Sequence, residues 1–460
     1  MRWTRKRLSA ALGLPEPTED RAYEGIGTDT RTLRPGEVFV ALRGPRFDGH
    51  AFLTEAVARG AAAAVVDRMP PDAPPGLELV VVPDTLEALG ALGRAARRAA
   101  NARVVAVVGS NGKTTTKELL RAVLGACYRV HATEGNLNNQ VGVPLTLLRA
   151  PEDATVWVIE MGTNAPGEIA WLTRVVEPDA AVVTGIAEEH LEGLGDLDGV
   201  LREELAVLDG LRDEGPAVVG DDPETLVAAA VARLGRARVR VAGLSAMADE
   251  RPEGGARGVR LEEDGSTRWR WRGLEVHLPL PGVHQVRNAL LALALGVLWD
   301  VPPAAAVTAL GRVRPGKLRG EWVRFGTLRV LVDCYNANPA SVRAAAELLA
   351  ALPVSNRKIL VLGTMHELGP RTDELHRAVA ADVTRYLGRG IDKVVATGRF
   401  AETFSPDDPR VLRHPDPLGA YDLLRLHLNG DEILLLKASR AEALERWLPR
   451  LAQDFGPPSE

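Results

Sequence analysis

Short apolar runs alternate with longer amphipathic segments along most of the chain, and the runs end in polar or glycine residues. Four of them occupy the middle of the chain, namely "RVVAVV" (103–108), "ATVWVIEMG" (154–162), "AAVVTGI" (180–186) and "GPAVVGDD" (215–222). Nearly continuous apolar strands between helices indicate a parallel sheet that is covered on both faces. Such sheets bind ligands outside the carboxyl ends of their strands. The pattern therefore predicts an α/β fold with a binding site at one edge of a central sheet.

The alternation falls into three parts, which we predict to be three domains. Residues 1–100 mix short strands with helices and predict a smaller N-terminal α/β domain. Residues 101–312 carry the parallel sheet. From residue 313 a second alternating unit begins, so residues 313–460 predict an open, Rossmann-like α/β domain. Its expected strands lie in "LRVLVDCYNANP", "RKILVLGTM", "KVVATG" and "EILLLKAS".

Three further patterns refine this division. Residues 258–280, "GVRLEEDGSTRWRWRGLEVHLPL", alternate in polarity and contain an Asp-Gly turn, which predicts a hairpin. The segment "GRVRPGKLRG" (311–320) is typical of a linker, and we expect a hinge there. The apolar run "NALLALALGVLWD" (288–300) is too short to span a bilayer, so we predict a buried helix.

The composition is that of an ordinary globular protein, with 46% hydrophobic and 25% charged residues. A net charge of −5 gives no bulk attraction to nucleic acid or to an anionic membrane. The two cysteines, Cys127 and Cys334, are too few for a disulfide framework or a cysteine-built metal site, which suits a reducing compartment. The basic N-terminus reaches proline and acidic residues before a signal-peptide core forms, so we expect a cytoplasmic protein.

The residues Gly-Ser-Asn-Gly-Lys-Thr at 109–114 lie between the first central strand and a helix-forming segment. Glycines let several backbone N–H groups point at an anion, and the helix N-terminus adds partial positive charge. The lysine can reach the outer phosphates of a nucleotide, and the next hydroxyl can ligate Mg²⁺. The spacing is shorter than in the common phosphate loop because residue 107 is Val. A tight turn that binds nothing is the weaker alternative. The predicted ATP-binding residues of this loop are Gly109, Ser110, Asn111, Gly112, Lys113, Thr114 and Thr115.

Polar residues that follow two neighbouring strands are candidate metal ligands. Glu160 ends one strand and His190 comes shortly after another, so both should lie at the same edge of the sheet as the loop. A carboxylate suits a hard cation. A histidine is a less usual Mg²⁺ ligand, so on residue type alone a structural role for His190 is favoured. The loop "EGNLNNQVGVP" (134–144) adds side-chain amides near this edge.

Several longer motifs then occur in a fixed order. They are "GSNGKTTTKE", "TEGNLNNQVGVPLTLL", "EMGTNAPGEIAWL", "EEHLEGLG", "GVHQVRNALLALA", "DCYNANPAS", "GTMHELG" and "GDEILLLKASR". Over nearly its whole length the chain resembles the Mur ligase family, and most closely those members that add D-alanyl-D-alanine. "DCYNANPAS" (333–341) discriminates best among them, whereas the loop at 109–114 is shared by all Mur ligases and by folylpolyglutamate synthases. Residues 28–61 resemble the family's UDP-binding domain.

The resemblance implies a reaction in the synthesis of peptidoglycan precursors. ATP phosphorylates the terminal carboxylate of UDP-N-acetylmuramoyl-tripeptide, the amine of D-alanyl-D-alanine attacks the acyl phosphate, and phosphate leaves. The central domain would bind ATP, the N-terminal domain the UDP end, and the C-terminal domain D-alanyl-D-alanine while completing the ATP site. Two Mg²⁺ ions are implied. We expect a monomer that neither binds nucleic acid nor inserts into a membrane.

Site residues carry over from the resemblance onto this sequence. Thr114 and Glu160 would hold the first Mg²⁺, His190 would help to hold the second, and Asn138 and Asn139 would lie near the phosphates or metal. Arg319 is the candidate for the γ-phosphate, with Lys317 as its rival. The implied nucleotide contacts beyond the loop are His284, Asn288, Asp333 and Tyr335. The implied D-alanyl-D-alanine contacts are Asn336 and Asn338. The implied contacts of the UDP end are Thr30, Arg31, Asp48 and His50.

The chain departs from the family at one informative position. Most Mur ligases carry a carbamylated lysine after the "HLEG" block, and the corresponding residue here is Glu204. No lysine lies between Lys117 and Lys317, which excludes a carbamate in the central domain. Either Glu204 (or Glu203) supplies the missing anionic oxygens, which makes Glu204 a candidate ligand of the second Mg²⁺, or both acids are only the exposed face of a helix. Smaller departures are Gln285, Thr364 and Ala438.

Two other functions stay open at this point. A sister amide ligase or a folylpolyglutamate synthase would share the phosphate loop and the metal site, although the "YNANP" segment argues against it. A nucleotide-binding module without ligase activity would explain the missing lysine. A phosphate-loop kinase or GTPase is more remote, because it would have no use for the last domain. The third residue of the tripeptide, whether diaminopimelate, lysine or ornithine, is not predicted.

Overall fold

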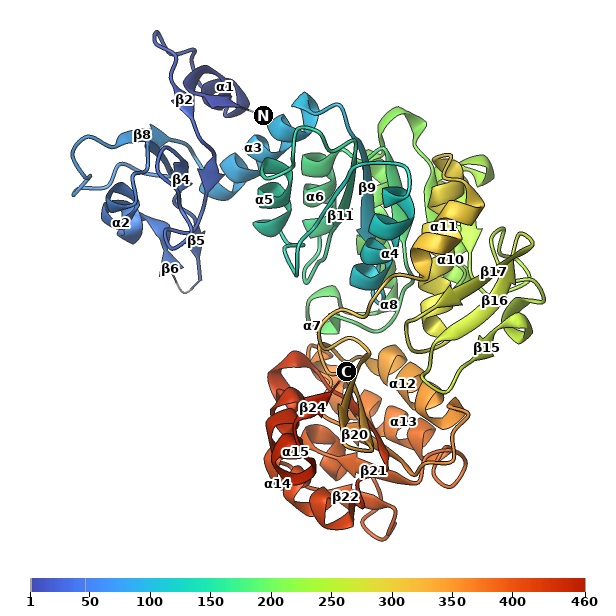
Figure 1. The fold of residues 1–460 in the computed structure, drawn as a ribbon. Helices are drawn as coiled ribbons and strands as arrows, with labels where there is room; N and C mark the ends of the chain where they lie inside the picture. The colour runs from blue at the N-terminus through green and yellow to red at the C-terminus, as the bar shows by residue number, and fades with distance from the viewer. Residues whose placement is uncertain (1, 46, 460) are drawn as a thin grey trace.

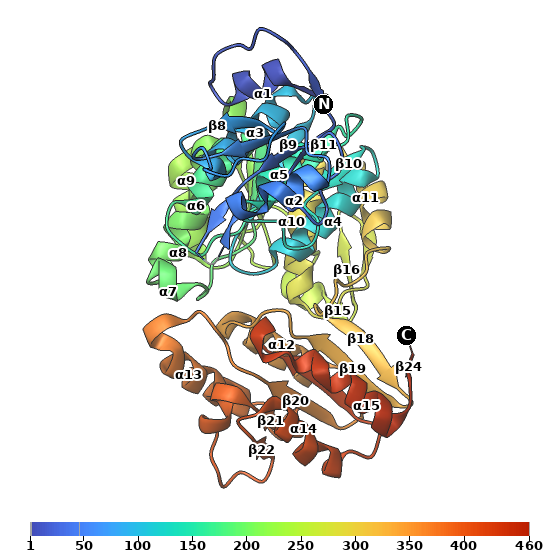
Figure 2. The same cartoon turned by 90° about the vertical axis from the view of Figure 1, so that its left-hand side faces the viewer.

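The computed structural model describes residues 2–45 and 47–459, and these form three parts, each built on its own sheet (Figure 1). In Figure 1 the central part adjoins both of the others, and in the view turned by 90° the N-terminal part lies in front of it and the C-terminal part below it (Figure 2). The predicted α/β fold is confirmed. The division at residues 100/101 and 312/313 stays a prediction, although each sheet falls within one predicted domain. None of the described helices combines the length and apolar character that a bilayer crossing requires.

The N-terminal part contains a parallel sheet with the strand order β3-β4-β7-β8. Its predicted strands and helices are present. The strands of this part are β1 (Trp3–Thr4), β2 (Ala22–Tyr23), β3 (Ile26–Gly27), β4 (Val38–Val40), β5 (Arg43–Gly44), β6 (Phe47–Asp48), β7 (Ala63–Val66) and β8 (Glu78–Val81). Its helices are α1 (Arg5–Ala11), α2 (Leu53–Ala58) and α3 (Thr85–Ala99).

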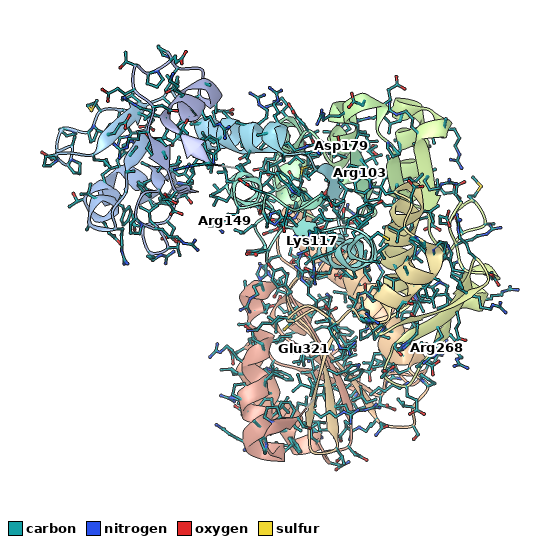
Figure 3. All side chains as sticks on the ribbon, turned by 45° about the horizontal axis from the view of Figure 1, so that its top comes forward. Arg103, Lys117, Arg149, Asp179, Arg268 and Glu321 are labelled. Atoms are coloured by element: carbon teal, nitrogen blue, oxygen red, sulfur yellow. The ribbon has the colours of Figure 1, made fainter. Side chains whose placement is uncertain are left out.

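Helix α3 joins the N-terminal part to the central one. It begins where the Asp84 carboxylate accepts hydrogen bonds from the N–H groups of Leu86 and Glu87, as an N-cap does. Near its other end Arg97 is buried and donates to Asp179 over 2.7 Å, and Asp179 is labelled in Figure 3. Because a buried charge is costly unless it is paired, this contact fixes the junction between the two parts.

The central sheet has six parallel strands in the order β10-β11-β9-β12-β13-β14. The strands are β9 (Arg103–Val108), β10 (Val130–Ala132), β11 (Val156–Glu160), β12 (Ala180–Val183), β13 (Ala217–Gly220) and β14 (Val239–Ala242). The helices are α4 (Lys113–Gly125), α5 (Gly142–Leu148), α6 (Glu168–Val176), α7 (Leu191–Leu194), α8 (Leu197–Glu204), α9 (Glu224–Leu234), α10 (His284–Leu298) and α11 (Pro303–Leu310). In this order β9, the strand before the phosphate loop, lies between β11 and β12 rather than at an edge of the sheet.

Strand β9 shows why this sheet is covered on both faces. Its residues Val104 and Ala106 pack into the cluster that contains α6, while Val105 and Val107 pack with α4 and α10. Alternate residues of a strand point to opposite faces, so a continuous apolar run needs helices on both sides. Helix α10 is the buried helix that the apolar run predicts.

The predicted hairpin is present, and it belongs to a small antiparallel sheet with the order β15-β16-β17. These strands are β15 (Arg260–Leu261), β16 (Thr267–Trp271) and β17 (Leu274–Leu278). The Asp-Gly turn at 264–265 joins the first two strands, and a second turn joins β16 to β17. The linker at 311–320 contains no helix or strand, which agrees with its predicted connecting role.

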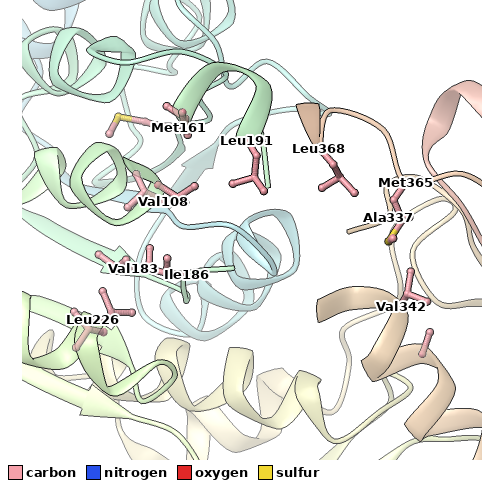
Figure 4. Packing of buried hydrophobic residues seen from close by; sticks show 14 of the residues in the cluster. Val108, Met161, Val183, Ile186, Leu191, Leu226, Ala337, Val342, Met365 and Leu368 are labelled. Carbon is pink, nitrogen blue, oxygen red and sulfur yellow. The ribbon is translucent and has the colours of Figure 1, made fainter. Parts of the chain in front are cut away.

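The C-terminal sheet has seven strands in the order β22-β21-β20-β23-β19-β18-β24, parallel except at β18 and β24. The strands are β18 (Glu321–Phe325), β19 (Leu328–Asp333), β20 (Lys358–Leu362), β21 (Lys393–Ala396), β22 (Val411–Arg413), β23 (Ile433–Lys437) and β24 (Pro458–Ser459). The helices are α12 (Pro339–Ala351), α13 (Thr372–Thr384), α14 (Pro417–Leu424) and α15 (Trp447–Phe455). A buried cluster extends from the central part to this one, with Leu191 and Leu368 facing each other between them (Figure 4).

Candidate active site

The phosphate loop lies between β9 and α4 and needs its two glycines. Gly109 and Gly112 have φ angles of +119° and +81°, a region that favours glycine. A Cβ at Gly109 would collide with the Thr184 hydroxyl, and one at Gly112 would collide with the Asn288 amide. No described side chain caps the N-terminus of α4. The first N–H groups of that helix are therefore available to an anion, as the sequence predicts.

Lys113 is held at the mouth of this loop. Its ammonium donates to the carbonyls of Gly109 over 2.5 Å and Ser110 over 3.2 Å. Burial alone would lower the pKa of Lys113, but the nearby carboxylates of Glu189, Glu204 and Glu160 outweigh burial and raise that pKa. The side chain therefore stays charged at neutral pH and can neutralise phosphate oxygens.

Glu160 ends β11 beside the loop. One of its oxygens accepts from the Thr114 hydroxyl over 3.1 Å and from the Asn138 amide over 2.8 Å. The other oxygen is buried and has no hydrogen-bond partner among the described residues. An unpartnered carboxylate oxygen next to a hydroxyl fits a hard cation. No three His, Cys, Asp or Glu side chains in the described part of the chain could hold a metal ion by themselves, so the nucleotide would have to supply further oxygens. Mg²⁺ is commonly bound in this way.

His190 lies at the same opening, between two carboxylates. Its Nδ1 is 2.6 Å from Glu367 of the C-terminal part, and its Nε2 is 3.3 Å from Glu189. Burial alone would lower the pKa of His190, but these two carboxylates raise it to about 9. Glu189 and Glu367 were not among the residues expected from the sequence. The "GTMHELG" segment thus does more than connect β20 to α13, because it brings Glu367 to the site.

Glu203 and Glu204, at the end of α8, are both buried, so the expectation of an exposed acidic helix face is wrong. Glu203 accepts from the N–H groups of Gly167 and Ile169, each over 2.7 Å, and so stabilises the start of α6. Glu204 accepts from the N–H of Gly109 over 2.7 Å and supports the phosphate loop from behind. Burial raises the pKa of Glu204 to about 7, although Lys113 opposes this. Its predicted role as a metal ligand stays a prediction.

The C-terminal part reaches the loop through the segment that follows β19. The side-chain amides of Asn111 and Asn338 bond to each other over 2.8 and 3.3 Å. Asn336 donates to Glu189 over 3.2 Å. The two asparagines that were assigned to the D-alanyl-D-alanine pocket therefore lie beside the phosphate loop and its acidic neighbour.

The two parts enclose a cleft of about 860 Å³. Arg319 lines it and stacks on Tyr335 at 3.8 Å, whereas Lys317 is not among its lining residues. Asp333 pairs with Lys437 over 2.9 Å. The cleft also contains most of the other residues that were expected to bind nucleotide or metal. These are Ser110, Asn111, Gly112, Lys113, Thr114, Thr115, Asn138, Asn139, Glu160, His190, His284 and Asn288.

Several charged residues of the cleft were not expected from the sequence. They are Glu189, Asp221, Asp222, Arg287, Arg343, Glu347, Glu367 and Lys437. Asp221 and Asp222 directly follow the run "GPAVVG", and the rule that strand ends carry sites could have found them. Arg343 and Glu347 lie on a helix face, for which the sequence gives no comparable signal.

The four residues expected at the UDP end lie in the N-terminal part and do not line this cleft. His50 is buried between Asp48, 2.6 Å away, and Asp67, 3.3 Å away. Arg31 is exposed and pairs with Asp29, while Thr30 is buried. Their predicted contact with substrate stays a prediction.

Comparisons with known proteins agree with this geometry. Family profiles described as "Mur ligase family, catalytic domain", "Mur ligase middle domain" and "Mur ligase, glutamate ligase domain" match residues 22–97, 107–296 and 318–440. The UDP-N-acetylmuramoyl-tripeptide–D-alanyl-D-alanine ligase of Bacillus subtilis is 35% identical over 437 residues, 93% of either chain. That of Escherichia coli is 35% identical over 444 residues, 95% of either chain.

Solved structures give the same result. A crystal structure of MurF from Acinetobacter baumannii superposes with a TM-score of 0.88 at 30% identity and covers 98% of this chain and 99% of that one. MurF of Thermotoga maritima in complex with ADP superposes with a TM-score of 0.77 at 25% identity, covering 94% and 97%. By profile, by sequence and by fold, this chain belongs to the Mur ligase family.

Proposed function

We propose that the protein joins D-alanyl-D-alanine to UDP-N-acetylmuramoyl-tripeptide at the expense of ATP, forming a peptide bond in the synthesis of peptidoglycan precursors. The observation that carries this proposal is the contact between Asn111 of the phosphate loop and Asn338 of the segment "DCYNANPAS". This contact places the phosphate loop next to the segment that best discriminates among members of the family, within one cleft. Relatives that bear this activity in their names align over 93 to 95% of the chain.

The reaction has two steps. A carboxylate oxygen of the tripeptide attacks the γ-phosphorus of ATP, so an O–P bond forms, the bond to ADP breaks, and an acyl phosphate results. The amine of D-alanyl-D-alanine then attacks the acyl carbon, a proton leaves the nitrogen, and the C–O bond to phosphate breaks. Phosphorylation is needed because a free carboxylate is a poor electrophile with a poor leaving group.

The cleft residues suit the first step. Two anions must approach each other, and Lys113 and Arg319 supply fixed positive charge where the phosphoryl group moves. The N–H groups of Gly109 and Ser110 are already bonded to Glu204 and Gly185, so the remaining loop N–H groups and the N-terminus of α4 hold the other phosphate oxygens. We assign Thr114 and Glu160 to a Mg²⁺ ion and His190 to a second one. Such ions would neutralise phosphate charge during transfer.

The C-terminal part suits the second step, since attack requires the two substrates to meet in one orientation. Asn336 and Asn338 border the phosphate loop, where the acyl phosphate forms. We propose that His284 and Asn288 flank the adenine, that Asp333 and Tyr335 lie near the ribose, and that the linker at 311–320 is the hinge. We further propose that the protein works as a cytoplasmic monomer.

Phosphate release tests the proposal. The protein, ATP and Mg²⁺ are combined with UDP-N-acetylmuramoyl-tripeptides ending in diaminopimelate, lysine or ornithine, with and without D-alanyl-D-alanine. Release should require both substrates, and mass spectrometry should detect the pentapeptide product. Release with a free amino acid but not with the dipeptide would instead indicate a sister ligase. A lack of ATP turnover with every substrate pair would indicate a nucleotide-binding module.

A further inference from the structure

D-alanyl-D-alanine carries a free carboxylate at its C-terminus. None of the residues assigned above provides a cation to bind it. This inference rests on the proposed function. The amine of D-alanyl-D-alanine must reach the acyl phosphate beside the phosphate loop. An extended chain spans about 3.3 to 3.6 Å per residue, so the carboxylate of a dipeptide lies roughly 7 Å from its amine. The cation that binds it should stand at that distance from the loop, inside the cleft.

Most cations of the cleft are already engaged. Lys113 is bound to the loop and serves the phosphates. Lys437 pairs with Asp333 and donates to the carbonyl of Asn336 over 2.7 Å. Arg319 stacks on Tyr335 and is assigned to the nucleotide. Arg287 of α10 forms an ion pair with the buried Asp221.

His190 also carries charge, but it lies between Glu189 and Glu367. Among the described residues, Arg343 of α12 is the remaining cation on the cleft wall. Its Nε donates to Asp382 over 2.7 Å, and that hydrogen bond orients the guanidinium. The two terminal nitrogens donate to no group among the described residues, and the side chain is 40% exposed. A guanidinium presents its donors in a planar fork that matches a carboxylate. Arg343 is thus a positioned cation with free donors.

The distance along α12 agrees with the length of the dipeptide. Asn338 begins this helix and touches the phosphate loop, and Arg343 follows five residues later. At a rise of about 1.5 Å per residue, the two positions are roughly 7.5 Å apart along the helix axis. The residues Ala340, Arg343, Ala344 and Glu347 line the cleft and share one helix face, because Arg343 and Ala344 each lie three or four residues from both Ala340 and Glu347.

We propose that Arg343 binds the free carboxylate of the incoming D-alanyl-D-alanine and so determines the selectivity for a dipeptide acid. Ala340 and Ala344 lie one turn apart beside Arg343 on the cleft-lining face, and their small side chains leave room for the methyl groups of the substrate. A single D-alanine is too short to reach both the acyl phosphate and Arg343. A dipeptide whose carboxylate has been converted to an amide lacks the partner of the guanidinium.

The test compares two changes to the same interaction. In Arg343→Ala, the KM for D-alanyl-D-alanine should rise about 10- to 100-fold, the range for losing a charged hydrogen bond, while the KM for ATP and for the UDP-linked peptide stays constant. Unmodified protein should show a similar preference for D-alanyl-D-alanine over D-alanyl-D-alaninamide, and the variant should lose that preference. Arg343→Lys should restore part of the affinity, because charge returns without the fork.

Arg385→Ala is the matched control. Arg385 pairs with the same Asp382 over 2.7 Å, but it does not line the cleft. Its variant should keep the KM for the dipeptide, so an effect on the packing around Asp382 is separated from an effect on the substrate. An unchanged KM in Arg343→Ala would overturn the inference, as would equal use of acid and amide by the unmodified protein, which needs no variant. Failure of the unmodified protein to use the dipeptide at all would instead overturn the proposed function.

Discussion

Helices α4 and α12 meet at the cleft from opposite domains, and each follows a parallel strand, yet they begin in different ways. Helix α4 starts after Gly112 with no described side chain at its N-cap. Helix α12 starts with a capping box, in which Asn338 accepts from the N–H of Ser341 and Ser341 accepts from the N–H of Asn338. Pro339 at its first position has no N–H to offer.

The difference separates two ways in which a helix can serve a site. The first turn of α4 keeps its N–H groups free, so an anion can bind at its end. In the first turn of α12, Pro339 has no N–H and the N–H of Ser341 is already bonded to the Asn338 side chain, so fewer donors remain for an anion. Helix α12 therefore contributes to the cleft through its lateral face, where Arg343 lies, and through the side-chain NH₂ of Asn338, which bonds to Asn111. The glycine at the start of α4 leaves the helix end open to an anion, whereas the Asn-Pro pair at the start of α12 caps it.

The largest effect should come from Lys113→Ala, which removes the lysine charge from the phosphate-binding end of α4. Phosphate release with all substrates present should fall by about 10²- to 10³-fold, because fixed charge at the transferring group is lost. Lys317→Ala, which alters a lysine outside the cleft, should change turnover less than about twofold. Similar losses in both variants would show that the charge acts at a distance rather than at the phosphates.

Gly112→Ala should remove the difference between the two helix starts in another way, because it deforms the start of α4 itself. The residue has φ +81°, and a Cβ would collide with Asn288. The loop must shift, so the Kd for ATP should rise about tenfold or more in a calorimetric titration. Gly125→Ala at the other end of α4 is the control, because its new Cβ meets nothing within 4 Å. An unchanged Kd in Gly112→Ala would mean that the loop geometry is not needed for binding.

Glu204 and Glu203 are neighbours on α8. Variants of Glu204 should affect the phosphate loop, whereas variants of Glu203 should affect the stability of the fold. Glu204→Ala should lower turnover by roughly tenfold or more, because it removes the acceptor for the Gly109 N–H. Glu203→Ala should instead lower the free energy of unfolding by about 1 to 3 kcal/mol, since it leaves buried N–H groups without partners. Turnover and denaturant unfolding of each variant are the measurements. Small and equal losses of turnover would remove Glu204 from the site.

A pH series should sharpen the role of Glu204 further. Its pKa is about 7 in the folded chain and 4.5 as the ordinary value, so between these pH values the folded state keeps a proton that the unfolded state has lost. Glu204 therefore favours folding below pH 4.5, and this contribution is lost as the pH rises through 7. In Glu204→Gln, the decrease in Tm between pH 5 and pH 7 should be smaller. Most of this range lies below the window from 6.5 to about 9, in which His190 keeps its proton in the folded state but loses it in the unfolded state. Parallel Tm curves would contradict the raised pKa.

The smallest effect should come from Ser341→Ala, which opens one half of the capping box of α12. The N–H of Asn338 loses its acceptor, so stability should fall by about 1 kcal/mol. The Kd for ATP should stay the same, in contrast with Gly112→Ala. Chemical denaturation and the ATP titration check the two statements. Loss of ATP affinity would mean that α12, too, acts through its N-terminus.

The sequence correctly predicted the strands, helices and turns that depend on local patterns. Strand β9 has the predicted bounds, α10 is the buried helix that its apolar run indicates, and the glycines of the loop have the positive φ angles that an anion site needs. The loop, Glu160 and His190 meet at one rim because parallel strands deliver their ends to the same edge. This part of the site needs no knowledge of how the domains pack.

Other features depend on contacts between distant segments and could not be predicted. Glu367 reaches His190 from another domain, and Arg343 lies on a helix face whose exposure depends on the closure of the cleft. Glu203 and Glu204 look like a solvated acidic pair in sequence, yet both are buried because α8 packs against the loop and against α6. Burial of charge is a property of the tertiary structure, and only specific partners make it tolerable.

The missing lysine of the central domain has a consequence outside the protein. With no amine between residues 117 and 317, there is nothing for dissolved carbon dioxide to modify. The carboxyl group of Glu204 belongs to the chain itself, so it cannot be lost when the gas becomes scarce. Whatever Glu204 contributes to the site is therefore independent of the bicarbonate around the protein.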